Sequence, residues 1–321
     1  MTLLELLNIE TGASIETLSR IIATAPRRYK VYQIPKKTGG MRTIAHPAKE
    51  LKVIQRVVLR NILDGISVSD IATAYVKNRG IAYNATVHIG QRWILKLDFK
   101  DFFPSIVPAD WDRVVRRNIA LKEFSKDSAQ FHKILFWGVG ERLPRCLSIG
   151  APTSPAVSNL VCAKLDEWMI QCAAEMNVKV TRYADDVTIS GDSVSKLLKF
   201  ERHLENALKR NSGIRIALNP GKRGLYGPGE RKMVTGIILT PDGRISIGRD
   251  RKREISSLIH RFTVHEAEQE MVMRAKGLLA FALSVEPEFF KSMCSKYGES
   301  QISRLMRVDP DFDMPDFDIE F

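Results

Sequence analysis

Alternating apolar and polar residues in the middle of the chain predict β-strands. Residues 93–98 alternate between bulky apolar side chains and polar ones, so this stretch predicts a strand that ends at Asp98. Residues 180–190 carry β-branched side chains on both sides of Asp185 and Asp186. This pattern predicts a hairpin with the two acids at its tip.

Apolar residues recur at helical spacing in several other stretches. The predicted helices are short ones within residues 1–30, with Ser14 as a cap; one opened by Pro47; one that starts at Thr153-Ser154-Pro155; one from Val194 to Asn211; and a mostly helical remainder from about residue 249. A strand pair around a basic turn is predicted over residues 29–46. The order strand, helix, hairpin, helix in the centre predicts an α+β fold, with helices packed on one face of a sheet.

The composition excludes a mostly disordered or fibrous protein, because 44% of the residues are hydrophobic and 27% are charged. The length of 321 residues suggests two domains, or one large domain with an appendage. No apolar run reaches the roughly 18 residues of a spanning helix, and no charged leader precedes an apolar core. We therefore expect a soluble, cytoplasmic protein with no membrane partner.

The positive charge is unevenly distributed along the chain. Lys and Arg number 49 against 37 Asp and Glu, which gives a formal net charge of +12. Residues 309–321 hold six acids and no base, so the rest of the chain carries +18. A basic body of this size is typical of proteins that bind polyanions, although a surface charged for solubility would give the same count.

The four cysteines do not predict a disulfide framework. They are few and scattered, and none forms the close pair that zinc sites use: Cys146, Cys162, Cys172 and Cys294. We expect buried, reduced thiols.

Two adjacent acids at a hairpin tip point to chemistry. Asp is a poor strand residue, and neighbouring carboxylates repel each other unless a cation neutralises them. A solvent-exposed turn would also tolerate them, but the flanks of Asp185 and Asp186 are apolar, and Asp98 supplies a third carboxylate. Oxygen ligands of this kind suit Mg²⁺. Two such ions about 3.5–4 Å apart would stabilise the attacking and leaving oxygens of a phosphoryl transfer.

Four short motifs, in order over about 125 residues, resemble those of reverse transcriptases. They are Asp98-Phe99-Lys100-Asp101-Phe102-Phe103, Gly150-Ala151-Pro152-Thr153-Ser154-Pro155, Tyr183-Ala184-Asp185-Asp186 and Leu218-Asn219-Pro220-Gly221-Lys222. The resemblance implies an RNA-directed DNA polymerase with a right-hand fold of fingers, palm and thumb.

Further residues resemble the bacterial retron reverse transcriptases in particular. They are Asn84-Ala85-Thr86-Val87-His88, Val234-Thr235-Gly236, the fingers residues Lys37, Gly39, Arg42 and Pro47, and the helix over residues 51–56. The resemblance covers roughly residues 30–305. One departure is Ile149, where the family usually carries Gln. It puts a polar contact near the template in doubt and leaves the metal ligands untouched.

The resemblance also implies roles for the acids. Asp98, Asp185 and Asp186 would be the catalytic residues and would hold two Mg²⁺ ions, for which Mn²⁺ could substitute. The backbone carbonyl of Phe99 would add a metal ligand, and its side chain would be core.

Four residues are expected to contact the incoming deoxynucleotide. Arg42 and Lys37 would clamp the triphosphate, with Lys36 an equal alternative to Lys37, unless these residues are only a solvated basic turn. Phe103 would exclude a ribose 2′-hydroxyl, or would be ordinary aromatic core. Lys222 would protonate or position the pyrophosphate, or would be a surface lysine.

The expected nucleic-acid contacts follow from the same resemblance. Asn84 and His88 would touch the cognate RNA, Val234, Thr235 and Gly236 would form the primer grip, and Arg249, Arg251, Lys252 and Arg253 would track phosphates. The alternatives are a structural His, strand core at 234–236 and a solvated helix face at 249–253.

These observations predict a retron reverse transcriptase that uses a dedicated non-coding RNA as template and primer. Synthesis would start at an internal guanosine 2′-hydroxyl and give a branched msDNA, which would serve in anti-phage defence with an accessory effector protein. The rivals are a reverse transcriptase of another class, with unbranched product, and a scaffold that holds RNA and restrains an effector.

The predicted parts are an N-terminal helical segment (1–30), fingers (31–90 with part of 107–149), palm (91–240), helical thumb (241–308) and an acidic tail (309–321). For the tail, docking onto a partner and simple solubilisation both remain open.

Overall fold

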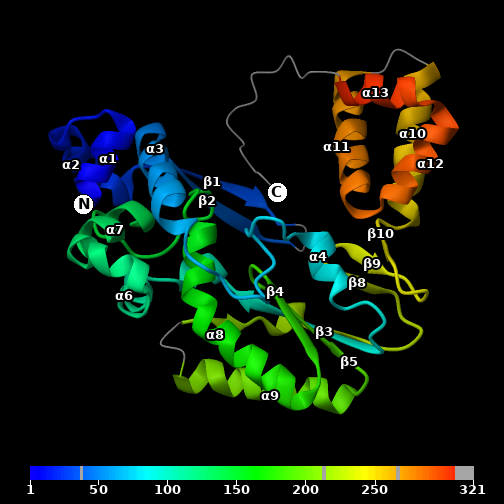
Figure 1. Cartoon of the computed structure of the whole chain (residues 1–321), viewed down its shortest axis with the longest axis horizontal. Helices are drawn as coiled ribbons and strands as arrows, with labels where there is room; N and C mark the ends of the chain where they lie inside the picture. The colour runs from blue at the N-terminus through cyan, green and yellow to red at the C-terminus, as the bar shows by residue number, and fades with distance from the viewer. Residues whose placement is uncertain (37–38, 212–214, 265–267, 308–321) are drawn as a thin grey trace. The chain divides into compact units, whose positions relative to one another are not determined.

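The computed structural model describes residues 1–36, 39–211, 215–264 and 268–307 (Figure 1). The chain forms two compact units. Unit 1 contains Met1–Val76 and Leu95–Leu225, and unit 2 contains Lys77–Ile94 and Tyr226–Phe321. Unit 2 therefore joins the predicted thumb to segments assigned above to the fingers and palm. The boundaries of the predicted subdomains stay a prediction, and the acidic tail lies outside the described residues.

Unit 1 begins with short helices, as predicted. Helix α1 spans Leu3–Thr11 and α2 spans Ile15–Thr24, and a 3-10 turn, η1, follows at Ala25–Arg27. The hydroxyl of Ser14 accepts a hydrogen bond from the backbone N–H of Thr17 at 3.2 Å, so Ser14 caps α2.

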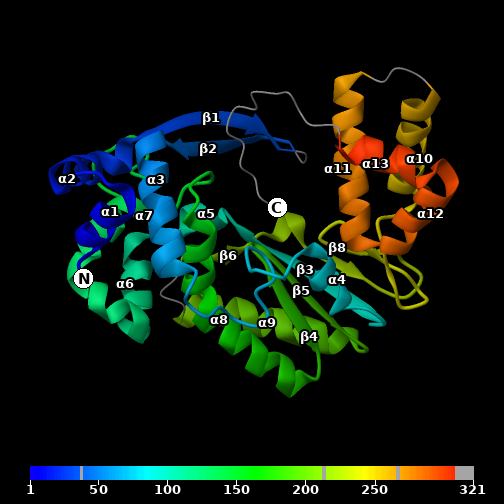
Figure 2. The ribbon, with the colours of Figure 1, turned by 45° about the horizontal axis from the view of Figure 1, so that its top comes forward.

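A two-stranded antiparallel sheet follows, with β1 at Tyr29–Pro35 and β2 at Met41–Pro47 (Figure 2). This confirms the predicted strand pair. Helix α3 spans Lys49–Val58 and continues into a π-helical turn, η2, at Leu59–Leu63. The prediction that Pro47 opens the helix was wrong. Pro47 is the last residue of β2, a strand-end position that tolerates the missing N–H of proline.

The central sheet of unit 1 has the strand order β4-β5-β3-β6, and β7 also pairs with β3. The strands are β3 (Trp93–Lys100), β4 (Lys179–Tyr183), β5 (Asp186–Gly191), β6 (Ala217–Leu218) and β7 (Gly224–Tyr226). Strands β4 and β5 form the predicted antiparallel hairpin. Because β3 lies next to β5, the strand that carries Asp98 runs beside the strand that carries Asp186.

Two long helices pack on this sheet and on each other (Figure 1). Helix α8, Ser154–Met176, contacts β4, and α9, Val194–Asn211, contacts β5. Pro155 lies in the first turn of α8, as predicted. The N-terminus of α8 has no capping hydroxyl from Thr153. Thr153 has helical backbone angles (φ −84°, ψ −22°) rather than the extended angles of a cap, and its hydroxyl makes no capping bond.

The remaining helices of unit 1 lie between β3 and α8 in sequence. They are α5 (Phe102–Ser105), α6 (Pro108–Arg117), η3 (Ile119–Asp127) and α7 (Ser128–Leu135). Helix α6 contacts α8, and α7 contacts α2 and α3. The buried rings of Trp111 and Phe131 lie 5.3 Å apart at the centre of this cluster.

Unit 2 combines one short helix, a small antiparallel sheet of order β10-β9-β8 and a helical bundle. Its elements are α4 (Ile81–Thr86), β8 (Lys232–Val234), β9 (Ile237–Leu239), β10 (Ile245–Ser246), α10 (Arg249–Val264), α11 (Gln269–Val285), α12 (Pro287–Tyr297) and α13 (Glu299–Arg307). They share one core, which includes Val234, Ile255 and Leu279. The mostly helical remainder predicted from residue 249 is confirmed.

All four cysteines are free; three of them are buried, and Cys294 is partly exposed. Burial raises the pKa of the Cys162 thiol to about 12, so this thiol stays protonated. Among the helices that the structure describes, none is long and apolar enough to cross a membrane.

Candidate active site

Asp185 lies at the tip of the β4–β5 hairpin. Tyr183 pairs with Asp186 across the hairpin, so Ala184 and Asp185 form a two-residue turn, with Ala184 at φ +55°. The carbonyl of Asp185 accepts a hydrogen bond from the backbone N–H of Phe99 at 2.9 Å. This bond ties the tip of the hairpin to β3.

The 3-10 turn η4, Pro220–Lys222, brings two polar groups to Asp98. The Asp98 side chain is only 4% exposed, and each of its oxygens accepts a hydrogen bond. Lys222 Nζ donates to Oδ1 at 2.7 Å, and Asn219 Nδ2 donates to Oδ2 at 3.1 Å. The backbone N–H of Asn219 also donates to the Asp98 carbonyl at 2.7 Å. Asn219 belonged to a recognised motif without an assigned role, and the structure makes it a residue that orients Asp98.

The acids and Lys222 form one electrostatic group. Burial raises the pKa of Asp185, and Asp98 raises it further against opposing contributions from a backbone N–H, Lys222 and Arg42. Burial also raises the pKa of Asp186 to about 6, and the charge of Asp185 adds to this shift. Partial burial disfavours the charge on Lys222, but its bond to Asp98 and the other carboxylates raise its pKa on balance. The carboxylates therefore repel one another, and a cation would relieve that repulsion.

The donor set fits a hard divalent ion. The carboxylates of Asp98 on β3, and of Asp185 and Asp186 on the adjoining β4–β5 hairpin, are anionic oxygen donors. Mg²⁺ and Mn²⁺ prefer ligands of this type. Among the residues that the structure describes, no three His, Cys, Asp or Glu side chains are close enough to form a ready-made metal site. The number and identity of the ions stay a prediction.

A buried ion pair supports the hairpin tip, and no sequence pattern pointed to it. Arg182 and Asp166 are both 0% exposed, and the guanidinium donates to the carboxylate from Nε at 2.7 Å and from Nη2 at 2.6 Å. Its Nη1 donates to Asn159 Oδ1 at 3.1 Å and to the carbonyl of Ala184 at 3.2 Å. The pair thus holds the backbone of the residue that precedes Asp185.

Arg42 interacts electrostatically with Asp185, and its role as a triphosphate clamp stays a prediction. It is exposed on β2, and its charge opposes the raised pKa of Asp185. The carbonyl of Ile149 accepts a hydrogen bond from the N–H of Ala45, so the backbone at the departure from the family pattern also meets β2. Lys37 lies outside the described residues.

The aromatic residues that follow Asp98 stack on one another. Phe99 is buried, as expected for core, and its ring lies parallel to that of Phe102 with centroids 6.0 Å apart. Phe103 is half-buried and meets Phe102 edge-on at 5.4 Å. The exclusion of a ribose 2′-hydroxyl by Phe103 stays a prediction. The metal contact of the Phe99 carbonyl also stays a prediction.

In unit 2, the two motifs that resemble retron markers contact each other. Thr235 and Gly236 form the two-residue turn between β8 and β9, at φ +45° and +81°. The Thr235 hydroxyl accepts a hydrogen bond from Asn84 Nδ2 at 3.3 Å and donates to the Ile81 carbonyl at 3.4 Å. Arg251 Nη1 donates to the Gly236 carbonyl at 2.8 Å. These bonds hold a turn that a β-branched residue adopts only with strain.

Three of the residues expected to contact nucleic acid are buried inside the protein. Asn84 and His88 are buried, as is Val234, which favours a role in holding the β8–β9 turn. Direct contact of these residues with RNA stays a prediction.

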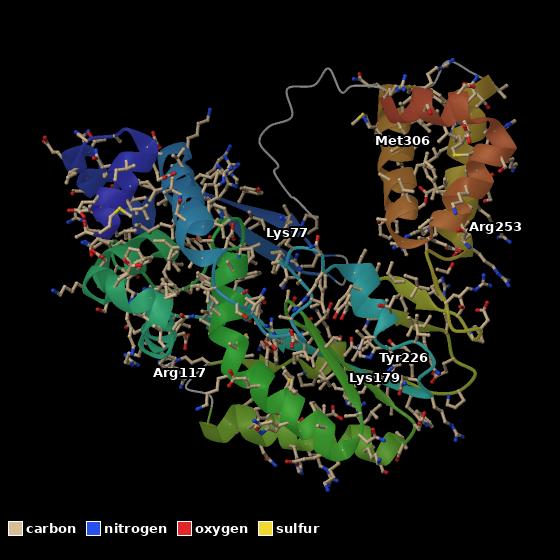
Figure 3. The ribbon with its side chains drawn as sticks, in the orientation of Figure 1. Lys77, Arg117, Lys179, Tyr226, Arg253 and Met306 are labelled. Carbon is tan, nitrogen blue, oxygen red and sulfur yellow. The ribbon has the colours of Figure 1, made fainter. Side chains whose placement is uncertain are left out.

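The four cations at the start of α10 also differ from one another. Arg251 binds the Gly236 carbonyl and covers the ring of Phe281, and Lys252 forms an ion pair with Glu286. Arg249 and Arg253 are exposed, and no described side chain pairs with either (Figure 3 labels Arg253 on α10). Only Arg249 and Arg253 are therefore free to meet phosphates without breaking an internal contact.

Comparison with known proteins identifies the family. The model of the family "Reverse transcriptase (RNA-dependent DNA polymerase)" matches residues 34–231. The Escherichia coli retron Ec83 reverse transcriptase is 34% identical over 87% of this chain and 90% of its own length. The chain belongs to the retron reverse transcriptases. The Escherichia coli retron Ec86 reverse transcriptase is 33% identical over 92% of this chain and 90% of its own length. The Myxococcus xanthus retron Mx65 reverse transcriptase is 31% identical over 86% of this chain and 67% of its own length.

This reverse transcriptase is an RNA-directed DNA polymerase, which uses an RNA template, and its family generally uses divalent metal ions. Solved telomerase structures from Candida tropicalis share the fold. The apo form gives a TM-score of 0.52 over 87% of this chain at 11% identity. The complex with a telomeric RNA fragment gives 0.53 over 85% at 12% identity. The chain spans 60% and 55% of those telomerase chains. The predicted polymerase fold is confirmed.

Proposed function

We propose that this reverse transcriptase copies a cognate non-coding RNA from the 2′-hydroxyl of an internal guanosine and so makes a branched RNA–DNA, msDNA. The support is its similarity to retron enzymes over most of both chains and the presence of both retron-like motifs. The bound product would act with an accessory effector protein in anti-phage defence, in the cytoplasm.

The observation that carries the catalytic part is the position of Asp98 on β3, beside the hairpin that bears Asp185 and Asp186. These acids, with the Phe99 carbonyl, would hold two Mg²⁺ ions, which would activate the attacking hydroxyl and stabilise the leaving pyrophosphate. Asn219 would keep Asp98 in one rotamer, because it bonds both the side chain and the backbone of that residue.

The cationic residues would act on the triphosphate. Lys222 is protonated and lies 2.7 Å from Asp98, so its flexible ammonium can exchange that carboxylate for a phosphate oxygen. Arg42 is exposed on β2, its charge acts on Asp185, and its guanidinium can bind phosphate with two N–H groups. Phe103 would exclude a ribonucleotide because its bulky ring leaves no room for a 2′-hydroxyl.

The test is to purify the protein from its native host and analyse the nucleic acid that accompanies it, with RNase and then a 2′,5′-debranching enzyme. We expect a small single-stranded DNA whose mobility changes on debranching. It should be absent from Asp185→Ala and present in Asp242→Ala, which removes an exposed acid from a loop of unit 2. Unbranched DNA would refute the priming proposal and leave the polymerase, whereas bound RNA without DNA would favour the scaffold.

A further inference from the structure

A rigid segment of unit 1 leads directly to the active site. Ala72 forms a parallel β-bridge with Arg182, and it is buried together with Thr73 and Ala74. The backbone N–H of Arg182 donates to the Ile71 carbonyl at 2.7 Å, and the N–H of Thr73 donates to the Arg182 carbonyl at 2.8 Å. The segment is therefore fixed to the strand that leads into the catalytic hairpin.

The same buried network holds the end of this segment. Asn159 Nδ2 donates to the Ala74 carbonyl at 2.9 Å, while its Oδ1 accepts from Arg182 Nη1 at 3.1 Å. Arg182 in turn donates to the Ala184 carbonyl at the hairpin tip. One ion pair and one amide thus set the positions of residue 74 and of the residue before Asp185.

At Tyr75 the chain leaves the buried network. Tyr75 has φ +60°, a left-handed conformation that is uncommon for a bulky residue, and its side chain is 51% exposed. A left-handed conformation at a bulky residue stores backbone strain, and such strain is concentrated at functional sites. The turn directs the ring out of the protein core.

The electrostatic surroundings of Tyr75 include groups of the candidate active site. The charges of Asp185 and Arg42 both act on its hydroxyl, as does the neighbouring Tyr183. Burial among the surrounding atoms raises the pKa of Tyr75 to about 12, and Asp185 adds to the shift while Arg42 opposes it. The hydroxyl stays protonated and feels the charges of both Asp185 and Arg42, and Tyr75 directly follows the residue that the Arg182–Asn159 network fixes beside the hairpin tip.

We propose that Tyr75 contacts the base pair that forms at the catalytic site, with its ring against the incoming nucleotide. This inference rests on the proposed assignment of Arg42 and Asp185. An aromatic ring can stack on any base, so the contact would favour nucleotide binding without selecting one base. The Arg182–Asn159 network acts as the support that keeps the ring in place.

The test is primer extension on a supplied RNA template with an annealed DNA primer, which needs no branched priming. Tyr75→Phe keeps the ring, whereas Tyr75→Ala and Tyr75→Gly remove it, and glycine also relieves the backbone strain. We expect Tyr75→Phe to match the wild type. We expect Ala and Gly to raise the KM for dNTPs roughly tenfold, with smaller changes in kcat.

Val139→Gly is the matched control, because Val139 has φ +54° and the same 51% exposure in the loop after α7. It should leave the KM unchanged, and melting followed by circular dichroism should show every variant folded. Folded Ala and Gly variants with wild-type KM would overturn the proposal, as would a Phe variant as impaired as Ala. Loss of the branched product alone refutes the priming proposal and leaves this one standing.

Discussion

Removal of either charge of the buried Asp166–Arg182 pair should destabilise the protein, and the two removals should differ in their response to pH. Arg182 makes two bonds to Asp166 and only two to neutral oxygens, with no exposure to water. Asp166→Asn keeps the size of the side chain but leaves a guanidinium that cannot lose its proton. We expect this variant to lose about 3–5 kcal/mol of unfolding free energy, with little dependence on pH.

Arg182→Met leaves a carboxyl group that can neutralise itself. Burial already raises the pKa of Asp166 above its usual value although Arg182 opposes the shift, so loss of the guanidinium raises this pKa further. Below about pH 4 the carboxyl is protonated in both the folded and the unfolded protein, and burying it carries no charge penalty. As the pH rises, only the unfolded state ionises, so the cost should grow by about 1.4 kcal/mol per pH unit up to the raised pKa.

The assay is urea unfolding followed by circular dichroism at about pH 5 and about pH 8. The double variant Asp166→Asn with Arg182→Met removes both charges, so it should cost less than the sum of the two single changes. Asp242→Asn breaks an exposed ion pair with Arg244 and should not shift the unfolding midpoint measurably. The reasoning fails if the single changes are additive, or if Arg182→Met costs the same at both pH values.

Three further outcomes are expected. Because the pKa of Asp186 is raised to about 6, protons should compete with the divalent ion below that pH. The Mg²⁺ concentration for half-maximal extension should therefore rise between pH 8 and about pH 5.5, and an unchanged requirement would contradict the assignment. Phe103→Ala should raise ribonucleotide over deoxynucleotide incorporation roughly 10- to 100-fold in extension assays, and an unchanged ratio would exclude the steric role. Arg253→Ala should reduce the salt dependence of RNA binding by about one unit of slope at unchanged melting temperature. Arg251→Ala should lower the melting temperature because the Gly236 carbonyl loses its hydrogen-bond donor. If the two variants show the same melting temperature and the same salt dependence, the distinction between a phosphate-binding Arg253 and a structural Arg251 is wrong.

The predicted strands and most predicted helices are confirmed because their signals are local. The alternation before Asp98 and the β-branched flanks of Asp185 required no knowledge of distant residues. Ser14 was also predicted correctly, because a cap depends on residues within one turn. The helix start at Thr153-Ser154-Pro155 was also predicted, although Thr153 has a helical backbone and its hydroxyl makes no capping bond.

The sequence predicted three acids as catalytic, but it gave no signal for the contacts that position them. Lys222 and Asp98 are 124 residues apart, and Asn84 and Thr235 are 151 apart, so no spacing rule connects them. Composition showed a basic chain without showing which cations are already paired inside it. Tyr75 carries no signal of its own, because its role depends on a backbone turn beside the hairpin.

The sequence therefore identified the chemistry and the family, since short motifs carry the reactive groups and their order. Burial of charge, pairing between distant polar groups and the direction of exposed side chains arise only when apolar surfaces pack together. Packing removes water from Asp166 and Arg182, and in a site without water each charge must find a specific partner. The partner, and hence the geometry of the catalytic tip, is set by contacts between segments that are distant in the chain.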